Sequence, residues 1–98
     1  MTTQAKTKTT VKTLKFIVPI IVEPDTIGFH SYSPALKGLH MDGDTEEEAL
    51  ENARLGAKDH IEVMIEHNVP IPLCIITGKY QRKTNAKGYY EEEIKVNY

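Results

Sequence analysis

The sequence has little of what marks several common protein classes. Among its 98 residues there is one cysteine, Cys74, so no intrachain disulfide can form, and a single thiol is typical of a reducing compartment. No run of about eighteen apolar residues is present, so we predict no membrane span. The N-terminal residues 1–12 (MTTQAKTKTTVK) contain lysines but no apolar h-region, which argues against a secretory signal. We therefore expect a cytoplasmic protein, with Cys74 as a small buried hydrophobic residue.

Residue sets that bind metals or activate nucleophiles are also missing. No cysteine and histidine spacing typical of a metal site occurs, and His60 and His67 lie about 10 Å apart along a predicted helix. We expect no catalytic residues, no cofactor and no metal site. Structural roles are predicted for all four histidines, without an individual assignment: His30, His40, His60 and His67.

The clearest pattern that is present is an amphipathic helix from Thr45 to His67. Thr45 is a favourable N-cap residue, and Glu48 three positions later completes a capping box. Asn68, followed by a proline two residues on, is a typical stop signal. Gly56 inside the helix permits either close packing on the sheet or contact with another chain. The predicted core stripe consists of Leu50, Ala53, Ala57, Ile61, Met64 and Ile65.

Apolar or alternating segments on both sides of this helix predict strands. Their order is β-β-β-α-β, with an optional last β, which indicates an α+β two-layer sandwich with one helix across one sheet face. Pro19 removes a ladder donor from the first strand, which places that residue at an edge or a bulge. We predict a mobile arm over residues 1–13 and a single domain over residues 14–98. The predicted strands are 14–22, 27–33, 38–42, 71–77 and 89–98.

Charge is distributed unevenly, although the net charge is only −2. Residues 23–66 carry eleven acids against three bases, whereas the segments on either side are basic. A solvated helix face is the first explanation, and attraction of a basic partner is the second. If a partner binds, we expect the acidic start of the helix and the turn before it to contribute: Asp42, Glu46, Glu47, Glu48 and Glu51.

Several segments, taken in order, resemble the HicB-like family of bacterial antitoxins. An apolar strand ends in an acidic-proline turn at residues 16–25 (FIVPIIVEPD), and a glycine-aromatic strand follows at 28–34 (GFHSYSP). After a Leu-Lys-Gly hinge, the helix starts as Gly-Asp-Thr-Glu-Glu-Glu-Ala at 43–49, and Pro-Ile-Pro at 70–72 enters an apolar segment. The resemblance covers about residues 14–77.

The resemblance implies a reduced RNase H-like domain that neutralises a HicA-like toxin, a small basic RNA-cleaving protein. Positions 16–22 carry no acid, whereas RNase H chemistry needs a metal-binding acid in its first strand, so we expect no nuclease activity. Many HicB proteins have a C-terminal DNA-binding segment, and the resemblance does not extend to one here. We do not expect operator binding by this chain alone. The alternative is a self-associating structural or regulatory module without a toxin, and we expect a homo-oligomer.

Overall fold

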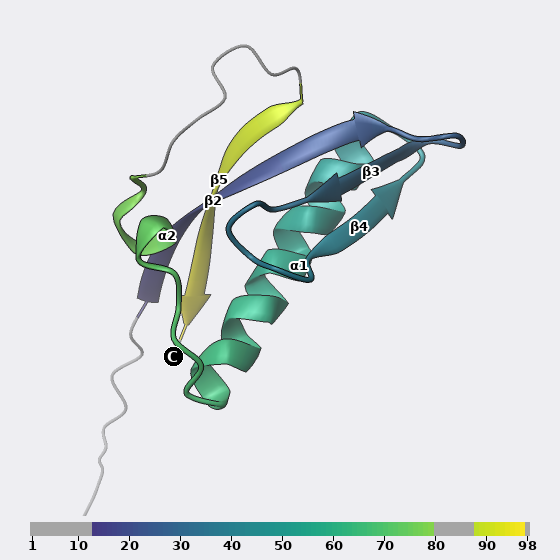
Figure 1. The fold of residues 1–98 in the computed structure, drawn as a ribbon. Coiled ribbons are helices and arrows are strands. Elements are labelled where there is room, and N and C mark those ends of the chain that lie inside the picture. The colour runs from purple at the N-terminus through teal and green to yellow at the C-terminus, as the bar shows by residue number, and fades with distance from the viewer. Residues whose placement is uncertain (1–12, 80–87, 98) are drawn as a thin grey trace, which may run out of the picture.

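A computed structural model describes residues 13–79 and 88–97 of the chain (Figure 1). The described segments form a mixed α+β fold, as the sequence predicts. In neither helix of these segments is there a stretch long and apolar enough to cross a membrane. The predicted mobile arm lies outside the described residues except for Thr13, which begins the first strand. In chain order the elements are β2 (Thr13–Pro24), β3 (Phe29–Tyr32), β4 (His40–Gly43), α1 (Glu46–Glu66), α2 (Leu73–Thr77) and β5 (Tyr89–Asn97).

The four strands make one antiparallel sheet in the order β4-β3-β2-β5. β2 is the long central strand: it pairs with β5 over residues 13–21 and with β3 over residues 21–24. Helix α1 lies across one face of this sheet (Figure 1) and contacts all four strands. The predicted two-layer α+β architecture is therefore confirmed.

The core forms where alternate residues of β2 meet α1. Phe16, Val18, Ile20 and Val22 point to the same side of β2, and each is at most 4% exposed. The facing side of the helix presents small residues, which lets the helix lie close to the sheet. These and their larger neighbour are completely buried: Ala49, Ala53, Ala57 and Ile61.

Gly56 has a packing role within the chain. A Cβ atom at this position would lie 3.1 Å from Leu39 Cδ1 and 3.2 Å from Met41 Sδ. These distances are tighter than ordinary van der Waals contact, so a larger residue would require the Leu39 and Met41 side chains to shift. Of the two predicted explanations for Gly56, close approach of the helix to its own sheet is the one observed.

The prediction of a strand at residues 71–77 is wrong, because this segment contains the short helix α2. A short apolar run does not distinguish a buried strand from a helix, since both are consistent with it. The helix starts after Pro72 and ends at Gly78, whose φ of 73° gives a left-handed C-cap that a glycine adopts without strain. Only Ile75 is buried, whereas Leu73 is 70% exposed, so the segment has one buried side rather than two.

Helix α2 packs against the part of β2 before Ile21. In this part β5 pairs with one side of β2, and β3 does not reach the other side. Backbone groups alternate in direction along a strand, and the Val22 N–H donates to the Gly88 carbonyl at 2.8 Å, on the β5 side. Odd-numbered residues in this part of β2, including Pro19, therefore turn their backbone groups away from β5. No strand pairs with them in the described residues, and Gly78 at the end of α2 lies beside Ile17. Pro19 thus has the local edge position that the sequence predicts.

The remaining strand boundaries shift for local reasons. The predicted strand 27–33 shortens to β3 because Asp25 and Gly28 close a tight turn, with the Asp25 N–H donating to the Gly28 carbonyl at 2.9 Å. After β3, the Ser33 hydroxyl accepts from the N–H groups of Ala35 and Leu36 at 3.1 and 3.3 Å, which starts the next turn. The predicted strand 89–98 is confirmed as β5, and residue 98 lies outside the described residues.

Replacement of Ile20 by alanine tests the importance of the β2 core. Ile20 is fully buried, so Ile20→Ala should reduce the free energy of unfolding by about 2–5 kcal/mol. The matched control is Ile27→Ala at the hairpin tip, where the side chain is 88% exposed and the change should stay within about 0.5 kcal/mol. Urea unfolding measures both. Similar losses for the two variants would contradict this core.

Candidate partner-binding surface

A hydrogen-bonded cap fixes the acidic start of α1. Thr45 has an extended backbone (φ −126°, ψ 164°), and its Oγ1 accepts a hydrogen bond from the Glu48 N–H at 3.0 Å. The Glu48 carboxylate accepts one from the Asp44 N–H at 2.5 Å. The predicted N-cap and its reciprocal glutamate are confirmed, although the return bond reaches the residue before the cap. Glu48 therefore has a defined folding role before any partner is considered.

Glu46 joins the first turn of α1 to β5. The Tyr90 hydroxyl donates a hydrogen bond to Glu46 Oε2. This bond to a carboxylate, with burial as the second cause, raises the pKa of Tyr90. Since Glu46 is half-buried in this contact, it is the member of the predicted acidic set that is least available to another protein.

Glu51 forms a bidentate ion pair with Arg54 on the next turn. The Arg54 Nη2 and Nε atoms lie 2.7 and 3.0 Å from the two Glu51 oxygens. The hydrogen bond from Arg54 lowers the pKa of Glu51, and the same bond raises the pKa of Arg54, with a further contribution from Glu92 on β5. Glu51 is exposed, so its carboxylate remains accessible beside this pair.

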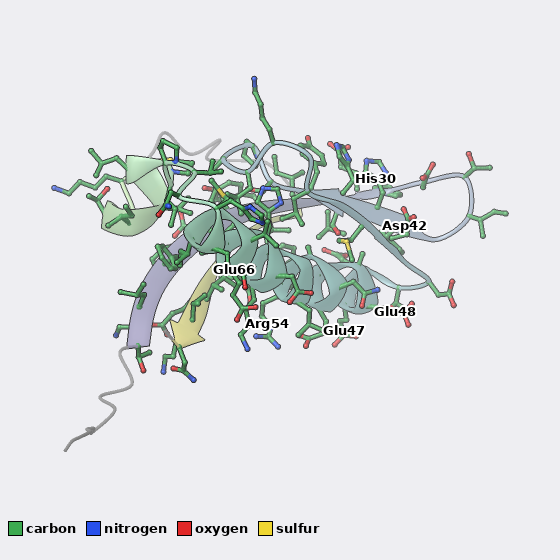
Figure 2. All side chains as sticks on the ribbon, turned by 90° about the horizontal axis from the view of Figure 1, so that it is seen from below. His30, Asp42, Glu47, Glu48, Arg54 and Glu66 are labelled. Atoms are coloured by element: carbon green, nitrogen blue, oxygen red, sulfur yellow. The ribbon has the colours of Figure 1, made fainter. Side chains whose placement is uncertain are left out.

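The five predicted acids do not form one cluster. Met41 packs on the core, so the alternation of β4 turns the Asp42 side chain to the sheet face opposite the helix. There Asp42 lies opposite His30 of β3 in the strand register. The Asp42 backbone carbonyl accepts a hydrogen bond from Asn52 Nδ2 at 2.7 Å. Figure 2 shows Glu47 on the side of α1 away from the sheet, and His30 beyond the sheet. The helix glutamates and Asp42 thus belong to two different surfaces.

Helix α1 has seven acidic residues against two basic ones, Arg54 and Lys58. Its side away from the sheet carries charge along its whole length, because the opposite side is committed to the core. Exposed carboxylates on such a side raise the local concentration of cationic partners and speed their encounter. We name this surface the acidic helix face and define it by Glu47, Glu48, Glu51, Asp59, Glu62 and Glu66.

An apolar groove, which the sequence analysis did not identify, runs beside the acidic helix face. Two adjoining depressions share His60 and Met64: one of about 330 Å³ lies on α1, and one of about 430 Å³ lies between α1 and the loop of residues 34–37. Val63 and Val69 line them and are about half exposed. Val63 lies outside the predicted core stripe, and the periodicity of the helix does not predict that residues 34–37 approach His60 and Met64. His60 is half-buried in the groove wall, which fits its predicted structural role.

Histidines and a tyrosine form a ladder on the sheet face away from the helix. The Tyr32 ring is stacked between His30 and His40, with ring centroids 6.1 and 6.0 Å apart. The two ring nitrogens of His30 lie 3.2 Å from Glu23 and 3.6 Å from Asp25. Within residues 13–79 and 88–97, no group of three or more histidine, cysteine, aspartate or glutamate side chains is arranged to hold a metal ion.

Cys74 occupies a different element from the one predicted. It lies on α2, half-buried and packed against the core. The prediction of a buried residue is therefore only partly correct, because Cys74 packs on the core but keeps some exposed surface.

Part of the chain is similar to the UPF0150 protein ssr1765 of Synechocystis sp. The two sequences are 42% identical over 45 residues, which are 46% of this chain and 57% of the relative. The chain therefore spans a little over half the length of this relative. No family model matches the chain, and no solved structure matches it. The relative's name gives no activity.

The cap of α1 can be tested at Thr45. Thr45→Ala removes the hydroxyl that accepts from Glu48 and should cost about 1 kcal/mol in the free energy of unfolding. Thr45→Ser keeps an acceptor at the same position, so this control should stay close to wild type. Chemical denaturation compares the three proteins. Equal losses for alanine and serine would exclude the capping bond as the cause.

The Glu51–Arg54 pair predicts a pH-dependent contribution to stability. Because the pKa of Glu51 is lowered in the folded state, the pair stabilises the fold above the ordinary carboxyl pKa, and this contribution disappears as the pH falls through the lowered value. Wild type should therefore be slightly more stable than Glu51→Gln at neutral pH, and the difference should vanish in acid. Thermal unfolding from neutral pH to about pH 3 measures it. Glu47→Gln is the control, and an identical pH trend in that variant would contradict the assignment.

Proposed function

We propose that this chain is a non-enzymatic, HicB-like antitoxin that neutralises a small basic RNA-cleaving toxin by protein–protein contact in the cytoplasm. The observation that carries the proposal is the acidic helix face, a row of carboxylates on a rigid helix, all exposed except for the half-buried Glu62. The resemblance of residues 14–77 to HicB-like antitoxins gives the partner's class, a HicA-like toxin. By the same resemblance, the sheet and helix correspond to a reduced RNase H-like domain. We do not expect this chain to bind operator DNA by itself.

The geometry suits capture of a cationic protein surface. An RNA-cleaving toxin must present cationic groups to phosphate, and carboxylates spaced along α1 compete for those groups. Charged groups mainly raise the association rate and select the partner, whereas buried apolar contacts supply most of the affinity. Asp59 belongs to the acidic helix face and also lines the groove at His60 and Met64. A toxin bound along α1 would therefore meet charge and apolar surface side by side.

A second candidate function is that of a self-associating structural or regulatory module without a toxin. The observation that favours it is the position of β5 at the end of the sheet order, with no strand beyond it in the described residues. Exposed sheet edges are templates for pairing with another chain. A homo-oligomer is expected under both functions, so oligomerisation by itself does not distinguish them.

Co-expression tests the antitoxin function directly. If a short basic protein encoded beside this gene arrests bacterial growth, expression of this chain should restore growth and the two proteins should co-elute on size exclusion. Growth arrest that persists, together with no complex in the presence of folded protein, would overturn the proposal. Cleavage of RNA by this chain alone would contradict its non-enzymatic character.

The acidic helix face is tested by paired charge removal. Glu47→Gln with Glu51→Gln should lower the association rate constant for the toxin about tenfold at low salt, with a weaker salt dependence than wild type. The control removes two carboxylates from the other side of the molecule, with Glu23→Gln and Asp25→Asn. Stopped-flow or surface-binding kinetics report both. If the two double variants slow association equally, net charge rather than this face would be responsible.

A further inference from the structure

The last strand, β5, lies at one end of the sheet that the described residues form. It pairs with β2 in a register that places Tyr90 opposite Ile20, and the Val22 N–H bonds the Gly88 carbonyl just before β5. Even-numbered backbone groups of β5 therefore face β2, and odd-numbered ones face away. In the described part of the chain, β2 is the one strand that pairs with β5. The backbone N–H and C=O groups of Glu93, Lys95 and Asn97 are thus directed to the outer edge.

Lys95 on this edge is in an unfavourable position within a single copy of the chain. It stands directly opposite Lys15 of β2, and like charges facing each other across strands destabilise a pair. Lys15 turns to Glu93, with its Nζ 3.4 Å from a carboxylate oxygen. Lys95 is exposed, and no carboxylate of the described residues pairs with it. A carboxylate from another chain, placed beyond this edge beside Lys95, would offset the repulsion between Lys95 and Lys15.

We propose that β5 pairs antiparallel with β5 of a second copy of this chain, about a two-fold axis at Ile94. In this register Glu93 of each copy lies opposite Lys95 of the other, so two intermolecular ion pairs form on the exposed sheet face. Glu93 and Lys95 both direct backbone groups to the edge, so each of these pairs also exchanges two N–H···O=C hydrogen bonds. The two sheets become one continuous sheet, with both α1 helices on the same side.

The charge sequence of β5 selects this register over its neighbours. Centred on Glu92, the pairing would put Glu91 opposite Glu93 twice. Centred on Glu93 or Lys95, it would put two identical charges face to face on the axis. A parallel pairing in register would oppose every charge to itself. Of the antiparallel registers from Glu92 to Lys95, only the one centred on Ile94 has no like-charge pair, and Ile94 itself is 2% exposed beneath α1.

Charged residues on an edge strand often serve only to prevent association. In β5 the charges prevent association selectively. They place like charges opposite each other in the neighbouring registers and opposite charges together in the register centred on Ile94. A second copy is the occupant that the sequence of β5 matches, since its pattern is complementary to itself in the antiparallel direction. This contact gives the geometry of the self-association that we proposed above as the second candidate function, and it rests on that function. It does not require a toxin, so its failure would leave the antitoxin proposal standing.

Sedimentation equilibrium on the full chain at low salt tests the contact. Wild type should form a dimer. Lys95→Glu places an acid opposite Glu93 at both ends of the contact, and Glu93→Lys places a lysine opposite Lys95, so each variant should raise the dimer dissociation constant at least about tenfold. An equimolar mixture of these two variants should regain the dimer as a heterodimer, because all the opposed charges are then complementary.

Lys58→Glu on α1, with the same charge change away from the edge, should dimerise as wild type does. Far-UV circular dichroism confirms that each variant is folded. A wild-type monomer at the highest soluble concentration would overturn the proposal. So would unchanged dimerisation of Lys95→Glu, or a mixture of the two folded edge variants that stays monomeric.

Discussion

The packing of α1 against the inner side of β2 is the constraint on which the rest of the structure depends. Val18 and Ile20 on the strand and Ala53 and Ala57 on the helix have no exposed surface. Small helix residues allow a close approach, so a domain of this size excludes water from its centre with a single long helix. β3 and β5 attach to the two sides of β2, and β4 extends the sheet from β3.

This division of α1 into a buried side and a free side connects fold to function. Once alanine and isoleucine occupy the inner side, the outer side is available for carboxylates without desolvation cost. Some acids still serve the fold: Glu48 completes the cap, Glu46 accepts from Tyr90, and Glu51 pairs with Arg54. These contacts fix the beginning of the helix, so the acids of the outer side are presented from a rigid element rather than from a loop.

The edges of the sheet differ from one another within the described residues. β4 is four residues long, and Asn52 of α1 binds its Asp42 carbonyl. The half of β2 that lacks a second strand is flanked by α2 and contains Pro19, which has no N–H to offer. β5 carries opposite charges at Glu93 and Lys95, and no strand of the described residues lies beyond it. The difference suggests that β5 is the edge at which pairing is permitted in a defined register.

The sequence by itself determined the elements whose signals are local. The Thr45 cap and the 3.6-residue stripe of α1, the apolar run of β2 and the turn residues around Asp25 and Gly28 act within a few positions, so their structures follow from neighbouring residues. Tertiary structure decided the rest. The run at 71–77 became α2 because its environment beside β2 buries one side only, and Gly56 acquired its role from Leu39 and Met41. Three further features arise where segments distant in sequence come into contact, and local sequence patterns do not predict such contacts. They are the separation of Asp42 from the helix glutamates, the groove at His60, and the position of Lys15 opposite Lys95.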